Sequence, residues 1–93
     1  MRDTKQSRLQ SRIADWSMLC GFEPREREFF ALAVKGLDDD ECATRMGIKP
    51  SMIAAHRKHI VRKVNATFRG RFCHFPDVLN AFYRETLGLA LIP

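Results

Sequence analysis

The chain has 93 residues, with 16 Lys and Arg against 11 Asp and Glu and a formal net charge of +5. This length predicts one domain with a thin core, to which a partner subunit could add. The chain lacks the run of about 18 apolar residues that a membrane span needs, and we expect no secretory signal peptide because its first residues are polar. Three cysteines without a Cys-x-x-Cys spacing argue against a disulfide scaffold or a zinc ribbon and favour a reducing cytoplasm. For a small basic domain of this kind, nucleic acid is the first candidate partner.

The positive charge is concentrated in one part of the chain. Residues 42–76 contain eight basic side chains and no acid, whereas residues 22–41 contain three bases and seven acids. Such a stretch is typical of a surface that binds a polyanion. A solvated cationic face is the ordinary alternative, so the charge alone does not decide between the two.

Apolar residues recur at helical spacing in five segments, and no segment alternates as a strand does. Proline opens three of these segments and glycine follows four of them, as expected at helix starts and stops. The predicted fold is a single all-α domain, a small helical bundle. Its expected parts are an N-terminal helix in 1–21 (helix 7–20), a central unit in 22–65 (helices 24–35, 39–46 and 50–65), and a loop, a C-terminal helix and an apolar tail in 66–93 (loop 66–75, helix 77–87, tail 89–93).

The short helix 39–46 and the longer helix 50–65 predict a helix-turn-helix. Asp38 and Glu41 have the spacing of a capping box at the start of the first helix. Gly47 tolerates the left-handed backbone that the tight turn needs. The second helix could then enter the major groove of duplex DNA, which is wide enough for one helix.

Residues 22–64 also agree in order, spacing and type with a protein family. The agreeing residues are Pro24-Arg25-Glu26-Arg27-Glu28, Gly36-Leu37, Glu41, Ala43, Arg45, Gly47-Ile48, Ile53, His56, Ile60 and Arg62-Lys63. On these residues the segment closely resembles the LuxR/GerE/FixJ family of bacterial DNA-binding domains. Region four of the sigma factors is the nearest competing family, but His56 and Arg62-Lys63 are more similar to LuxR-type proteins.

The resemblance implies a tetrahelical domain, with an extra N-terminal helix here, in which the third helix reads DNA and the last helix mediates dimerisation. It implies three sets of site residues. Base contacts are expected from Ser51, Met52, Ala54, Ala55 and Lys58; phosphate contacts from Lys49, Arg57, His59, Arg62 and Lys63; and a dimer interface from Val78, Leu79, Phe82 and Tyr83.

Three positions depart from the family pattern. Lys49 stands where a Ser or Thr usually caps the recognition helix, so a cap worth about 1 kcal/mol is missing. The acids of residues 38–40 include a position where the family often has Lys, and Ala54 stands where it often has Lys or Arg. These departures predict poorer direct readout of bases than in typical members.

Two further groups of residues lie outside the resemblance. Trp16 of the first helix is expected to pack on the core. Four phenylalanines after residue 65 (Phe68, Phe72, Phe75 and Phe82), beside the apolar tail, favour a subunit interface over a core role. Only about 21 residues precede the matching segment, so we expect no receiver or ligand-binding domain in this chain.

The sequence predicts no catalytic residue, no metal site and no cofactor. No nucleophile and base have a supporting context, and the adjacent Cys73 and His74 lack a second pair of ligands. The favoured function is a stand-alone bacterial or phage transcription regulator that binds duplex DNA as a homodimer, in the cytoplasm at the nucleoid. The alternative is an interaction protein, an anti-activator or an RNA-polymerase-docking factor, that binds a larger regulator instead of DNA.

Overall fold

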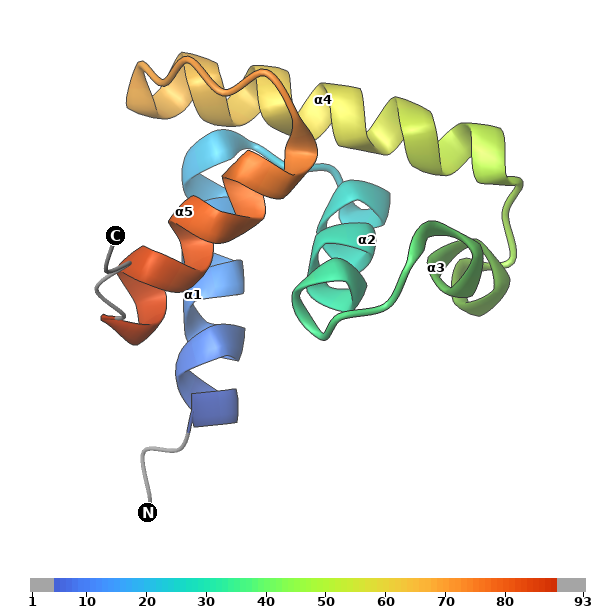
Figure 1. The fold of residues 1–93 in the computed structure, drawn as a ribbon, viewed down its shortest axis with the longest axis horizontal. Helices are drawn as coiled ribbons and strands as arrows, with labels where there is room; N and C mark the ends of the chain where they lie inside the picture. The colour runs from blue at the N-terminus through green and yellow to red at the C-terminus, as the bar shows by residue number, and fades with distance from the viewer. Residues whose placement is uncertain (1–4, 89–93) are drawn as a thin grey trace.

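The computed structural model describes residues 5–88, which form five helices with no strand between them. In Figure 1, α4 lies across the top of the molecule; α1 and α5 run side by side below one half of it, and α2 and α3 lie below the other half. The all-α prediction is therefore confirmed. The predicted apolar tail, 89–93, lies outside the described residues. The helices are α1 (Lys5–Cys20), α2 (Pro24–Val34), α3 (Asp39–Met46), α4 (Pro50–Phe68) and α5 (Phe75–Leu87).

α1 is part of the core. Trp16 is only 2% exposed, and its ring packs against three aromatic rings from three other helices. The ring centroids lie 6.1 Å from Phe30, 5.1 Å from Phe68 and 5.1 Å from Phe82. The expectation that Trp16 packs on the core is confirmed. Since buried aromatic side chains contribute a large share of the energy of a small core, α1 is needed to complete this one.

α5 buries its apolar stripe inside the chain. It packs against both α1 and α4, and Val78 and Phe82 are 0% exposed. Their predicted place in a dimer interface is therefore wrong, because a side chain with no accessible surface cannot meet a second copy. Leu79 and Tyr83 are half-buried and keep some surface, although the Tyr83 hydroxyl already donates a hydrogen bond to the Val34 carbonyl.

The phenylalanines of the C-terminal third have mixed surroundings. Phe75 and Phe82 belong to the core, and Phe72 is half-buried against it. The expectation of a subunit interface is wrong for Phe75 and Phe82, since rings of the same chain cover them. Phe29 and Phe30 of α2 pack on Phe75, and Trp16 of α1 and Phe30 pack on Phe82. Phe68 remains 42% exposed although it packs on Trp16.

α4 continues three residues beyond its predicted end at Asn65, and α5 begins at Phe75 rather than Asp77. Because Phe68 packs on Trp16, the extra turn is stabilised by a contact that is remote in sequence. The Asn65 side chain then bonds to both backbone groups of Phe72, with Nδ2 donating to O and the Phe72 N–H donating to Oδ1, each at 2.9 Å. A Cβ on Gly70 would lie 3.0 Å from Asn65 Oδ1 and from the Phe72 ring, so a larger residue there would have to push one of these side chains aside by a few tenths of an ångström.

No helix within residues 5–88 is both long and apolar enough to cross a membrane.

Candidate nucleic-acid interface

The turn between α3 and α4 is built as the sequence predicted. The Glu41 N–H donates to Asp38 Oδ1 at 2.8 Å, and the Asp38 N–H donates to Glu41 Oε1 at 3.0 Å, which completes a capping box. Gly47 ends α3 with φ 66° and ψ 37°, in the left-handed region. The Ile48 N–H then bonds to the Ala43 carbonyl at 3.0 Å. These contacts set the direction in which α4 leaves α3.

α4 has one buried stripe and one accessible face. Its buried side chains recur every three or four residues and face the core: Ile53, His56, Ile60 and Val64. The opposite face has a shallow hollow on its surface, lined by Ser51, Ala54, Ala55, Lys58, His59 and Arg62. Met52 lies beside this set and is 46% exposed. We call these seven residues the outer face of α4. It brings together all five predicted base-contacting residues and two of the five predicted phosphate-contacting residues.

The start of α4 carries positive charge and lacks a side-chain cap. Lys49 is the N-cap residue, is exposed, and makes no capping hydrogen bond; Pro50 follows at the first helical position. The first backbone N–H groups of the helix therefore keep their partial positive charge, which favours an anion at this end. The prediction that the start of α4 lacks a side-chain cap is confirmed.

Arg57 lies on the flank of α4 that faces α3. Its Nη1 atom is 2.8 Å from Asp39 Oδ2, and both side chains are close to half exposed. The ion pair joins α4 to the acidic first turn of α3. Arg57 is therefore paired with a carboxylate. Solvent screening keeps such a pair weak, so another anion can replace Asp39 easily.

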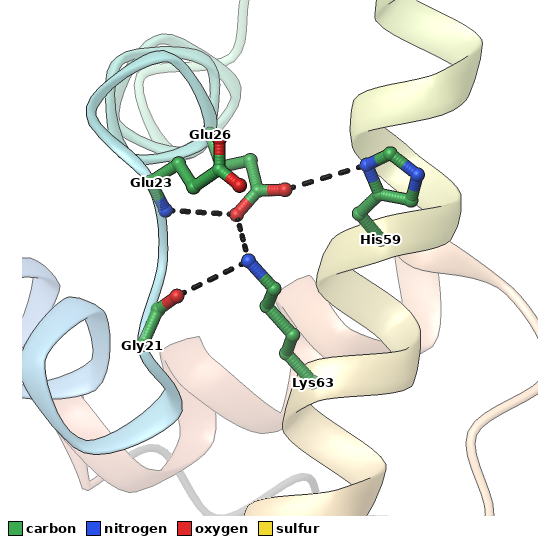
Figure 2. Close-up of polar contacts among 5 residues, drawn as sticks. All are labelled: Gly21, Glu23, Glu26, His59 and Lys63. Carbon is green, nitrogen blue, oxygen red and sulfur yellow. Dashed lines mark hydrogen bonds and ion pairs between the residues drawn. The ribbon is translucent and has the colours of Figure 1, made fainter.

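Lys63 lies on the opposite flank and points into the protein (Figure 2). Its Nζ donates to Glu26 Oε1 at 2.6 Å and to the Gly21 carbonyl at 3.1 Å. The Glu26 side chain is only 4% exposed, and the Glu23 N–H donates to the same oxygen at 2.8 Å. The ammonium of Lys63 is thus committed to a buried carboxylate. This pairing argues against the predicted phosphate contact of Lys63.

The Glu26 carboxylate is ionised in this setting. Burial would raise its pKa, but the hydrogen bonds from Lys63 and from the Glu23 N–H outweigh burial, together with the charges of Lys63 and His59, and the pKa of Glu26 falls below its ordinary value. His59 Nδ1 lies 3.4 Å from Glu26 Oε2, while the imidazole is 46% exposed. His59 is therefore the residue of the outer face that also borders this buried carboxylate.

Residues 22–74, more than half of the chain, match the family model GerE, described as bacterial regulatory proteins of the luxR family. This chain belongs to the LuxR family. The comparisons with curated proteins and with solved structures found no match. The LuxR match extends past the predicted Val64 to His74, and so includes the segment that returns along α4.

Several LuxR motif residues serve the fold rather than the outer face. Arg25 Nη1 donates to the Met46 carbonyl at 3.1 Å and so caps the end of α3. Glu26 and Lys63 join α2 to α4, and His56 is buried against Phe29. The Glu26–Lys63 pair was not predicted from the sequence. Both residues stood in the motif, but nothing in their spacing of 37 residues indicates that they meet.

Proposed function

We propose that this protein binds duplex DNA in a sequence-dependent manner and regulates transcription as a LuxR-type regulator in the cytoplasm. α4 would enter the major groove with its outer face toward the bases. The LuxR family supports DNA-binding regulation in general, whereas the residue assignments rest on the geometry of α4.

The observation that carries this proposal is the composition of the outer face. Lys58 and Arg62 are exposed on it, with small side chains beside them at Ser51, Ala54 and Ala55. The stretch 42–76 that contains this face has no carboxylate of its own. Lys58 can donate to guanine O6 and N7, and alanine methyl groups can pack on the methyl group of thymine. A face with small residues and few charges can also approach the base edges closely.

Phosphate contacts would position the domain without reading sequence. Arg62 is exposed at the edge of the outer face, and Lys49 lies at the positive start of α4. His59 is half-exposed, and Arg57 would have to exchange Asp39 for a phosphate. We therefore retain Lys49, Arg57, His59 and Arg62 as proposed phosphate contacts and omit Lys63.

A homodimer remains part of the proposal. The half-buried Leu79 and Tyr83 are what is left of the predicted interface on α5. In a symmetric dimer, two copies of α4 would meet two half-sites about 34 Å apart, one turn of the duplex.

Selection from a library of random duplexes tests this function. The expected result is an enriched motif with two related half-sites about 10 base pairs apart. The enriched duplex should bind more tightly than its scrambled counterpart at the same salt concentration. Failure to enrich any motif over several rounds would contradict sequence-dependent binding.

The alternative function is an interaction protein that docks on a larger regulator or on RNA polymerase. The acidic first turn of α3 favours it, as do the exposed apolar side chains Met18 and Leu19 on α1. In this case the protein would bind no duplex at about 150 mM salt, near physiological ionic strength. A stable complex with a protein partner would be recovered instead, and substitution of Met18 and Leu19 by Ser would weaken it.

A further inference from the structure

Three potential metal ligands converge where α2 crosses α4. Within residues 5–88, one group of at least three such side chains has its ligand atoms all within 4.8 Å of one another: Glu26, His56 and His59. Two members are buried and one is exposed. Glu26 Oε2 and His59 Nδ1 lie 3.4 Å apart. Two ligands bound to one ion at about 2.0–2.1 Å in a tetrahedron are separated by a similar distance.

His56 has no partner that explains its polar atoms. The residue is 9% exposed, and neither of its ring nitrogens makes a hydrogen bond within the described part of the chain. Phe29 stacks against the ring at a centroid distance of 6.3 Å. Buried polar groups are normally paired, since leaving one unpaired costs about 1–3 kcal/mol. An ion between His56 and the two other side chains would give one of its nitrogens a partner.

We propose that Glu26, His56 and His59 form a binding site for a divalent transition-metal ion of the zinc class. Glu26 Oε2, His59 Nδ1 and one ring nitrogen of His56 would be the ligands. Two imidazoles and one carboxylate match the ligand preference of such ions. Because His59 reaches the surface, the fourth position would be open to solvent.

The Glu26 carboxylate can serve the ion and Lys63 together. Lys63 and the Glu23 N–H both bond to Oε1, so Oε2 faces His59 and is available. The ion pair with Lys63 favours the anionic carboxylate that a metal ligand must be. The ammonium of Lys63 repels a second cation nearby, so the site is expected to bind weakly compared with a structural zinc site.

Such an ion would fasten the recognition helix to α2. His56 and His59 are three residues apart on α4, whereas Glu26 is in the first turn of α2. An ion that binds only the folded chain raises its stability by mass action. This site does not depend on the proposed function, because its ligands act within the chain whether or not the outer face meets DNA.

The test uses the full chain without an affinity tag, at neutral pH, with Co²⁺ as a visible probe and Zn²⁺ as the competing ion. Cys73 is exposed and is changed to Ser in every variant. Cys20 and Cys42 are buried, and burial raises the pKa of both thiols, which keeps them protonated and poor ligands. The expected result is saturable binding of one Co²⁺, displaced by Zn²⁺, and a higher midpoint of thermal unfolding when Zn²⁺ is present.

Two histidine variants make the test specific. His59→Gln removes a ligand at a half-exposed position, so the protein should still fold. Loss of a residue that only supports a metal ligand weakens binding about 10–100-fold, so loss of a ligand should weaken Zn²⁺ binding by at least as much. His74→Gln is the matched control, since His74 is exposed outside the cluster; it should leave binding and the thermal shift intact. Absence of saturable binding, or equal binding by the His59→Gln protein and the control, would overturn the proposal.

Discussion

Arg57 Nη1 lies 2.8 Å from Asp39 Oδ2, so an arginine of α4 is paired with an aspartate at the start of α3. The pair sits beside the proposed DNA-binding face. It gives the acidic turn of α3 a specific effect on binding, because Asp39 both adds negative charge near the phosphates and holds an arginine that could reach them.

Substitution of Asp39 by Asn should therefore tighten duplex binding. The change releases Arg57 and costs less than about 1 kcal/mol of stability, as expected for an exposed pair at a helix start. The dissociation constant, measured by fluorescence anisotropy, should fall. Asp40→Asn is the matched control, since it removes the same charge one residue away. An equal gain from Asp40→Asn would show that charge alone matters and that the Arg57 pairing does not.

The Glu26–Lys63 pair should show strong thermodynamic coupling. Lys63→Met leaves a buried carboxylate with fewer partners, and Glu26→Gln leaves a half-buried ammonium without its anion, so each should cost about 2 kcal/mol. The double variant should lose less than the sum of the two single losses. Urea denaturation of all four proteins measures this difference. Strictly additive losses would contradict a direct pair.

Trp16→Ala should unfold the protein or nearly so. Removing this side chain from among three aromatic rings is expected to cost about 3–5 kcal/mol, close to the whole stability of a small domain. Met18→Ala, two residues along the same helix, is the control because Met18 is 77% exposed. It should change stability by less than about 0.5 kcal/mol. Thermal unfolding followed by circular dichroism compares them, and a Trp16→Ala protein as stable as the control would show that α1 is peripheral.

Asn65→Ala should release the segment that returns along α4. The change leaves the N–H and carbonyl of Phe72 without their side-chain partners, at a cost of about 1–3 kcal/mol. Amide hydrogen exchange should rise in residues 69–74 before it rises elsewhere. Asn80→Ala, at an exposed position on α5, should leave the exchange pattern unchanged. Unaltered protection in the Asn65→Ala protein would contradict the bridging role of this side chain.

Local signals in the sequence predicted most of the fold. Asp38, Gly47 and Pro50 act through neighbours a few residues away, so the capping box, the turn and the start of α4 could all be expected from spacing. The same holds for the outer face of α4, where helical periodicity separates the exposed Lys58 from the buried Ile60.

The remaining features depend on contacts between residues far apart in the chain. Phe68 extends α4 because Trp16 lies beside it, and Phe82 is buried because α1 covers α5. Lys63 belongs to the same basic stretch as Lys58 and Arg62, and only the position of Glu26 separates its role from theirs. Residue type and spacing predicted where the helices lie, but not which cation faces inward.

The salt dependence of duplex binding tests the DNA-binding claim most directly. It should be measured for the unaltered protein and for two double variants. The α4 variant carries Lys58→Ala and Arg62→Ala. The control variant carries Lys35→Ala and Arg84→Ala, which remove the same charge from exposed positions next to α1. We predict binding that weakens steeply with salt, a loss of about tenfold or more with a shallower slope in the α4 variant, and no such loss in the control. Equal behaviour of the two double variants, or no binding at about 150 mM salt, would contradict the claim that α4 contacts DNA.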